Sequence, residues 1–83
     1  MKVETLKKLL KENKENGGGY VNVSMYLNLH RNKYEIRVRD HETDALIQKH
    51  YRSMKKSATA TMNSICETYI LKGYLINDTY MDF

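Results

Sequence analysis

Residues 20–39 read YVNVSMYLNLHRNKYEIRVR. From position 20 to 30, aliphatic residues alternate with tyrosine, asparagine and serine, and a period of two places them on one side of a β-strand. The side expected to be buried carries Val21, Val23, Met25, Leu27 and Leu29. A polar turn follows, and a second alternating run occupies residues 33–39. The segment therefore predicts an antiparallel hairpin with strands at 20–30 and 33–39.

A third strand is predicted at residues 45–51, after a polar turn at 40–44. Its buried side is left open, because either Ala45 and Ile47 or Leu46 can face the core. Three consecutive strands joined by short turns favour an antiparallel meander.

An amphipathic helix is predicted before the hairpin, at residues 2–15. Its apolar residues recur at helical spacing, and lysine and glutamate occupy the other side. The apolar set is Val3, Leu6, Leu9 and Leu10. Three glycines at 17–19 end the helix, because glycine readily adopts the left-handed conformation that follows a helix.

A second helix is predicted after the third strand, at residues 54–72, with Ser53 or Ser57 as its N-cap. Gly73 ends it. Its apolar positions at helical spacing are Ala58, Met62, Ile65, Cys66 and Tyr69.

The order of elements places the chain in the α+β class as one αβββα domain spanning residues 1–83. Its 83 residues suffice for a single core. Both helices are expected on one face of the three-stranded meander, because a sheet with one apolar face needs a cover. Residues 75–83 are expected to be a short tail.

The one cysteine cannot form an internal disulfide, which favours a reducing, cytoplasmic location. No stretch approaches the ~18 apolar residues of a membrane span, so a membrane partner is not expected. Positive charge gathers in the middle of the chain, where residues 30–56 hold eight Lys or Arg and four acids. Such a bias favours polyanionic partners and is also compatible with an ordinary solvated surface.

Nothing in the sequence forms a catalytic or metal-binding set, and no cofactor or enzymatic activity is expected. The histidines at positions 30, 41 and 50 lack the short spacing of metal ligands. Cys66 lies on the apolar side of a helix, where a buried structural role is usual. Four carboxylates alternate with arginines around the second strand, which favours surface ion pairs: Glu35, Asp40, Glu42 and Asp44.

The polar side of the hairpin is a possible partner face. It mixes aromatic rings with guanidinium groups, and both nucleobases and a protein surface suit such a mixture. Its members are Tyr20, Tyr26, Arg37 and Arg39. Tyrosine is also a good strand former, so these rings can be merely exposed strand residues.

The order of elements and several residues resemble a double-stranded-RNA-binding domain over roughly residues 4–70. His30 with Lys33 and Tyr34 is similar to that family's loop histidine before an aromatic strand start. Residues 55–58, Lys-Lys-Ser-Ala, look like its Lys-Lys-x-Ala at the second helix. The family's glycines before both motifs are missing. The resemblance implies an RNA surface made of the first helix, the loop between strands one and two, and the start of the second helix.

The leading expectation is a module that binds duplex or structured nucleic acid through backbone electrostatics. Its expected contact set is Lys7, Lys8, Lys11, His30, Arg31, Lys33, Lys55 and Lys56. The alternative is a small phage or mobile-element protein that binds and blocks a host defence enzyme such as a nuclease. Its small size, A/T-rich residue usage and the aromatic tail with Tyr80, Met81 and Phe83 favour this alternative. An oligomer is also possible.

Overall fold

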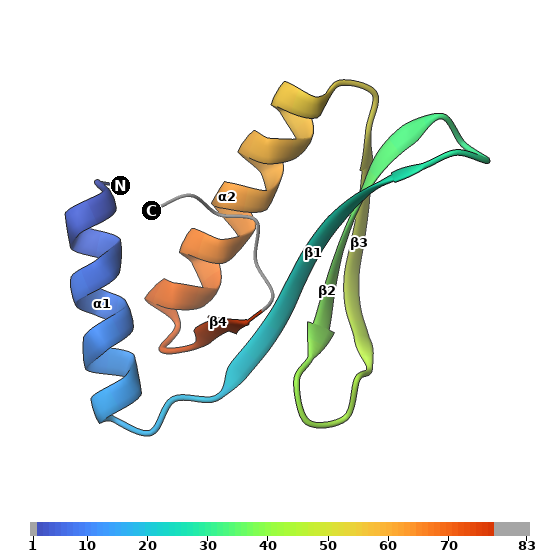
Figure 1. Cartoon of the computed structure of the whole chain (residues 1–83). Coiled ribbons are helices and arrows are strands. Elements are labelled where there is room, and N and C mark those ends of the chain that lie inside the picture. The colour runs from blue at the N-terminus through green and yellow to red at the C-terminus, as the bar shows by residue number, and fades with distance from the viewer. Residues whose placement is uncertain (1, 78–83) are drawn as a thin grey trace.

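The computed structural model describes residues 2–77 (Figure 1). Its elements are α1 (Val3–Glu15), β1 (Tyr20–Asn28), β2 (Lys33–Asp40), β3 (Leu46–Arg52), α2 (Lys55–Leu71) and β4 (Leu75–Asn77). The α+β class and the predicted order of helix, three strands and helix are confirmed. The predicted tail residues Tyr80, Met81 and Phe83 lie outside the described part of the chain.

The strands form one sheet in the order β3-β2-β1-β4. β1 and β2 pair antiparallel from Val21 opposite Asp40 to Asn28 opposite Lys33, and β2 and β3 are also antiparallel. The meander is therefore confirmed. β4 pairs in parallel with the start of β1, where a tail was predicted. Gly73, at φ 98°, turns the chain back, and the amide of Leu75 donates to the carbonyl of Gly19 at 2.8 Å.

The core lies between α2 and the sheet. The strands contribute Val21, Val23, Ile36 and Val38, each at most 1% exposed. The predicted apolar positions of the second helix pack against them and are all buried, namely Ala58, Met62, Ile65, Cys66 and Tyr69. The prediction of the α2 face, including Cys66 as a core residue, is confirmed.

Burial along β1 stops earlier than the alternation predicts. Met25 is half-buried, but Leu27 is 46% exposed and Leu29, beyond the end of the strand, is 80% exposed. The prediction that both leucines are buried is wrong. Figure 1 gives the reason: the β1–β2 hairpin projects past α2, so its far end has no helix over it.

α1 does not cover the meander. Among the described elements, its Cα atoms come within 8 Å of α2 and β4 only. Leu6 is its buried apolar residue, and the side chain of Asn13 donates to the carbonyls of Ile70 and Tyr74, both at 2.9 Å. The expectation that both helices pack on the three strands is therefore corrected: both lie on one side of the sheet (Figure 1), but α2 alone contacts the meander.

Two further details differ from the sequence analysis. The N-cap of α2 is Met54, without a side-chain capping bond, and not Ser53 or Ser57. Leu46 is 45% and Ile47 47% exposed, so neither alternative for the buried side of β3 holds. Polar Gln48 pairs opposite the core residue Val38 instead. No helix in the described range is long and apolar enough to cross a membrane.

Candidate nucleic-acid interface

The turn between β1 and β2 has a defined conformation that presents basic residues. The side-chain oxygen of Asn28 accepts hydrogen bonds from the amides of His30 (3.0 Å) and Arg31 (3.2 Å). Asn32 adopts the left-handed conformation at φ 52°, which asparagine tolerates better than most residues. His30, Arg31 and Lys33 are consequently exposed on an ordered turn.

The start of α2 lies at the same end of the molecule as this turn. Tyr34 pairs opposite Arg52, the last residue of β3, and α2 begins three residues later at Lys55. The guanidinium of Arg31 lies over the ring of Tyr51, 4.8 Å from its centroid. We call this set the basic end: His30, Arg31, Lys33, Arg52, Lys55 and Lys56.

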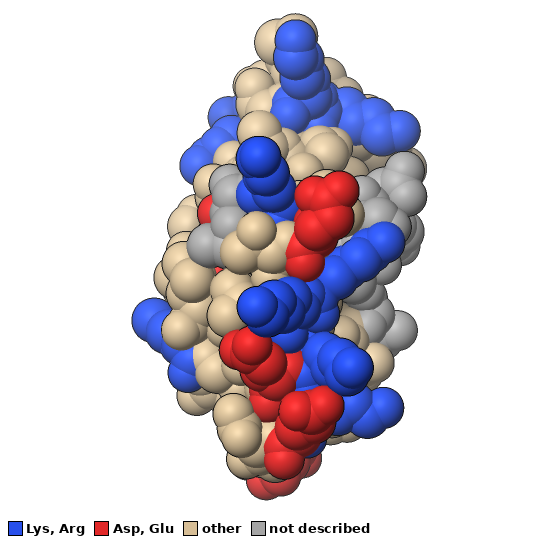
Figure 2. Space-filling model, turned by 90° about the vertical axis from the view of Figure 1, so that its left-hand side faces the viewer, with Lys and Arg blue, Asp and Glu red and all other residues tan. Residues whose placement is uncertain are grey.

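The basic end is separated from the acidic groups. Residues 28–34 and 45–59 contain no carboxylate. Apart from Glu35, the described carboxylates lie on α1, in or beside the β2–β3 turn, or in the second half of α2: Glu4, Glu12, Glu15, Asp40, Glu42, Asp44 and Glu67. Figure 2, which views the α1 side, shows red and blue side chains interleaved over most of this face and only blue ones at its upper end.

The three α1 lysines of the expected contact set lie on a different surface. Lys7, Lys8 and Lys11 are exposed, but α1 contacts only α2 and β4 among the described elements. α2 extends beyond α1 at the end where the hairpin turn lies (Figure 1). The structure thus places the hairpin and α2 members of the expected set at the same end of the molecule and leaves the α1 members apart.

A second cluster occupies the face of the sheet that no described helix covers, here called the open face. Glu35 lies at its centre, between Tyr26 on β1 and Tyr51 on β3 in the strand register. Tyr26 and Arg37 both donate to one oxygen of the Glu35 carboxylate, and Asn28 donates to the other at 3.0 Å. We call Tyr26, Glu35, Arg37 and Tyr51 the tyrosine cluster.

Glu35 is a buried anion, with only 1% of its side chain exposed. Burial opposes its ionisation, but hydrogen bonds from Tyr26, Asn28, Arg37 and Tyr51 outweigh burial and lower its pKa to about 2. The same carboxylate raises the pKa of Tyr26 and of Arg37 by accepting their hydrogen bonds. The expected ion pair with arginine is present: its carboxylate is buried, and the Arg37 side chain is 32% exposed.

Cations surround the two rings of the tyrosine cluster. The Arg37 guanidinium lies 5.4 Å from the centroid of the Tyr26 ring, and the Lys49 ammonium lies 5.8 Å from that of Tyr51. With Arg31 on the same ring, the cluster joins the basic end. Tyr51, Lys49 and Arg52 were not among the predicted site residues. Lys49 and Tyr51 are two residues apart on the predicted third strand, and this spacing was a signal that they share one face. Arg52 directly follows Tyr51 and lies on the opposite face, with its partner Tyr34.

The other two residues of the expected partner face lie elsewhere on the sheet. Tyr20 packs against His41, with ring centroids 5.6 Å apart. Arg39 donates to the backbone carbonyl of Asp44 at 3.0 Å. The expected face therefore divides into the tyrosine cluster near the hairpin turn and a second group near the β2–β3 turn.

Within the described part of the chain, the cysteine and the carboxylates, which are potential nucleophiles and metal ligands, lie apart. Among residues 2–77, no group of three or more His, Cys, Asp or Glu side chains is placed to hold a metal ion. Cys66 is fully buried in the core. The carboxylate of Asp40 caps its own turn by accepting from the amides of Thr43 and Glu42, and these hydrogen bonds lower its pKa.

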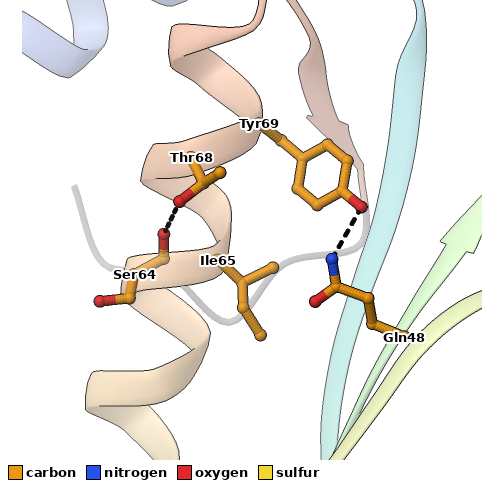
Figure 3. Close-up of a pocket in the computed structure, with 5 residues that line it drawn as sticks. All are labelled: Gln48, Ser64, Ile65, Thr68 and Tyr69. Carbon is orange, nitrogen blue, oxygen red and sulfur yellow. Dashed lines mark hydrogen bonds between the residues drawn. The ribbon is translucent and has the colours of Figure 1, made fainter.

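A shallow pocket of about 130 Å³ lies between α2 and β3 (Figure 3). Its lining residues are Gln48, Ser64, Ile65, Thr68 and Tyr69. Tyr69 accepts a hydrogen bond from Gln48 at 3.2 Å, and the Thr68 hydroxyl donates to the Ser64 carbonyl at 2.9 Å. The lining is made of amide, hydroxyl and apolar groups and carries no charged side chain.

Comparison of the chain with protein-family models, with curated proteins and with solved structures finds no significant match.

Proposed function

We propose that the protein is a non-enzymatic module that binds nucleic acid, with the basic end as its principal contact surface. The observation that carries this proposal is the gathering of Arg31, Lys33, Arg52, Lys55 and Lys56 at one end, in two segments that contain no carboxylate. Such a surface attracts a phosphate backbone and releases its counterions. The resemblance to the double-stranded-RNA-binding domain adds support, because its loop and second-helix motifs fall within this surface.

The first turn of α2 supports a binding role for its lysines. It contains Lys55 and Lys56 and no acidic residue. Cations are unfavourable at a helix N-terminus, where the helix dipole favours negative charge. A phosphate placed at this end would compensate both the lysine charges and the exposed helix amides.

The test is the affinity of the purified protein for a labelled blunt duplex, measured by fluorescence anisotropy from about 50 mM to about 200 mM salt. Lys55→Glu/Lys56→Glu should weaken binding by more than about tenfold and reduce the salt dependence. The matched control is Lys7→Glu/Lys8→Glu, which changes the same charge on α1 and should weaken binding much less. Equal losses in both variants would show that net charge, and not the basic end, governs binding.

A second candidate is the protein inhibitor of a host enzyme, and one observation favours it. Three apolar side chains are exposed next to the basic end: Leu27 at 46%, Leu29 at 80% and Met54 at 64%. Exposed apolar groups of this kind are typical of protein contacts when they form a continuous patch. Absence of duplex binding even at about 50 mM salt would favour this candidate.

A further inference from the structure

We propose that the tyrosine cluster on the open face binds unpaired nucleobases by stacking, so that the ligand of the basic end includes a single-stranded segment. This inference rests on the proposed nucleic-acid function and adds a ligand class to it. Four observations carry it: the uncovered face, the fixed rings, the surrounding cations and the continuity with the basic end.

The two rings lie on one face and on either side of a single residue. Tyr26 on β1 and Tyr51 on β3 both pair opposite Glu35, which lies on β2 between them. Because paired residues of neighbouring strands share a face, both rings lie on the open face with their Cα atoms about 10 Å apart. No described helix or strand packs on this face. Tyr26 is 40% exposed.

The tyrosine cluster is preorganised by its buried anion. The hydroxyl of Tyr26 and the guanidinium of Arg37 share one oxygen of Glu35, which restricts the directions their side chains can take. A ligand that stacks on an already ordered ring loses less conformational entropy on binding. Glu35 thus orders the Tyr26 side without exposing negative charge to the ligand.

The charges of the open face favour a nucleic acid strand as the occupant. Arg31, Arg37 and Lys49 carry three positive charges around the rings, and the one carboxylate among them is the buried Glu35. The phosphates of a strand would pair with the cations, and the faces of its bases would stack on the tyrosine rings. In a duplex the base faces are covered by neighbouring bases, so only unpaired nucleotides satisfy both.

Arg31 connects the tyrosine cluster to the basic end. Its guanidinium lies over the Tyr51 ring, 4.8 Å from the centroid, but its backbone belongs to the turn and not to a strand. Arg31 can therefore exchange the ring for a phosphate and leave the ring to a base. A strand bound in this way would run from the hairpin turn onto the open face.

The test compares a labelled oligothymidylate of about 12 nucleotides with an abasic strand of the same length and charge. The two strands carry the same number of phosphates, so a difference in affinity between them reports the contribution of the bases. Wild-type protein should bind the base-containing strand at least about fivefold more tightly. Tyr51→Ala should abolish this ratio and Tyr51→Phe, which retains the ring, should keep most of it. Tyr20→Ala, a similarly exposed tyrosine near the other end of the face, is the matched control and should keep the ratio.

Each outcome decides between the proposals. Equal wild-type affinity for both strands overturns stacking and leaves phosphate binding by the basic end intact. If a folded Tyr51→Ala variant keeps the wild-type ratio of affinities for the two strands, the tyrosine cluster does not bind the bases. Failure to bind either strand or a duplex overturns both proposals and favours a protein ligand. The wild-type comparison needs no substitution, so it decides even where a variant fails to fold.

Discussion

Tyr26 donates its hydroxyl hydrogen bond to Glu35 across the β1–β2 pair, on the face of the sheet that no described helix covers. The carboxylate is as inaccessible as the aliphatic core, with 1% of its side chain exposed. Within residues 2–77, its hydrogen-bonding neighbours are side chains of the same face, among them Tyr26, Asn28 and Arg37. Hydrogen bonds to Glu35 therefore hold the side chains of the open face in a defined arrangement. On the other face of the sheet, packing against α2 has this role.

The ionisation of Glu35 should make stability depend on acid pH. Its pKa is about 2 in the folded protein and 4.5 ordinarily, so folding favours the ionised form. The resulting stabilisation is fully present above about pH 5 and is lost as pH falls from there towards 2. Urea unfolding should show that wild type loses more stability between about pH 5.5 and 3 than Glu35→Gln does.

The same experiment measures how much Glu35 contributes to the free energy of unfolding at neutral pH. Glu35→Gln should lower the free energy of unfolding by about 1 kcal/mol or more, because it replaces hydrogen bonds to a charged acceptor by weaker bonds to a neutral amide. Glu12→Gln, which changes an exposed carboxylate on α1, is the control and should leave stability almost unaltered. Parallel pH profiles for wild type and Glu35→Gln would contradict the assignment of the low pKa.

Two hairpin residues that the sequence pattern alone predicts to be buried, Ile36 and Leu27, should differ in how much they contribute to stability. Ile36→Ala should cost about 2 to 5 kcal/mol, since Ile36 is fully buried beneath α2. Leu27→Ala should cost less than about 1 kcal/mol, because Leu27 is 46% exposed beyond the end of the helix. Denaturant unfolding of the two variants checks this, and a larger loss for Leu27→Ala would mean that another surface covers the hairpin.

Periodicity predicted the elements and most of the core because it reports which side of an element is apolar. The α2 stripe from Ala58 to Tyr69 and the β1 positions Val21 and Val23 were found in this way. Periodicity does not report how far the covering helix reaches. Leu27 and Leu29 continue the β1 alternation past the point where α2 begins, so their exposure depends on tertiary arrangement.

The candidate site was predictable where it depends on local sequence and not where it depends on register. The basic turn and the lysine pair at 55 and 56 stand out in the sequence, and the pairing of Tyr34 with Arg52 places both at the same end of the molecule. Tyr51 joins Tyr26 only because both pair opposite Glu35. β4 was not predicted for another reason: its three residues are too few to show the periodicity of a strand.

The glycine run contains one position where a side chain cannot fit. A Cβ at Gly18 would lie 2.4 Å from the carbonyl oxygen of Gly73 and 3.0 Å from that of Asn13. Both atoms are backbone, so relief requires moving the end of α1 away from the connection between α2 and β4. Gly18→Ala should lower the free energy of unfolding by about 1 to 3 kcal/mol, the usual cost of overpacking.

Gly19→Ala is the matched control for this close approach. A Cβ there would meet the Tyr74 ring at 3.8 Å, which is ordinary van der Waals contact. Its stability should stay within about 0.5 kcal/mol of wild type. Since about 1 kcal/mol shifts the melting temperature of a domain this small by about 4 to 8 °C, thermal unfolding resolves the two variants. Equal melting temperatures would show that α1 docks loosely, and that the hydrogen bonds from Asn13 to Ile70 and Tyr74 do not fix its position.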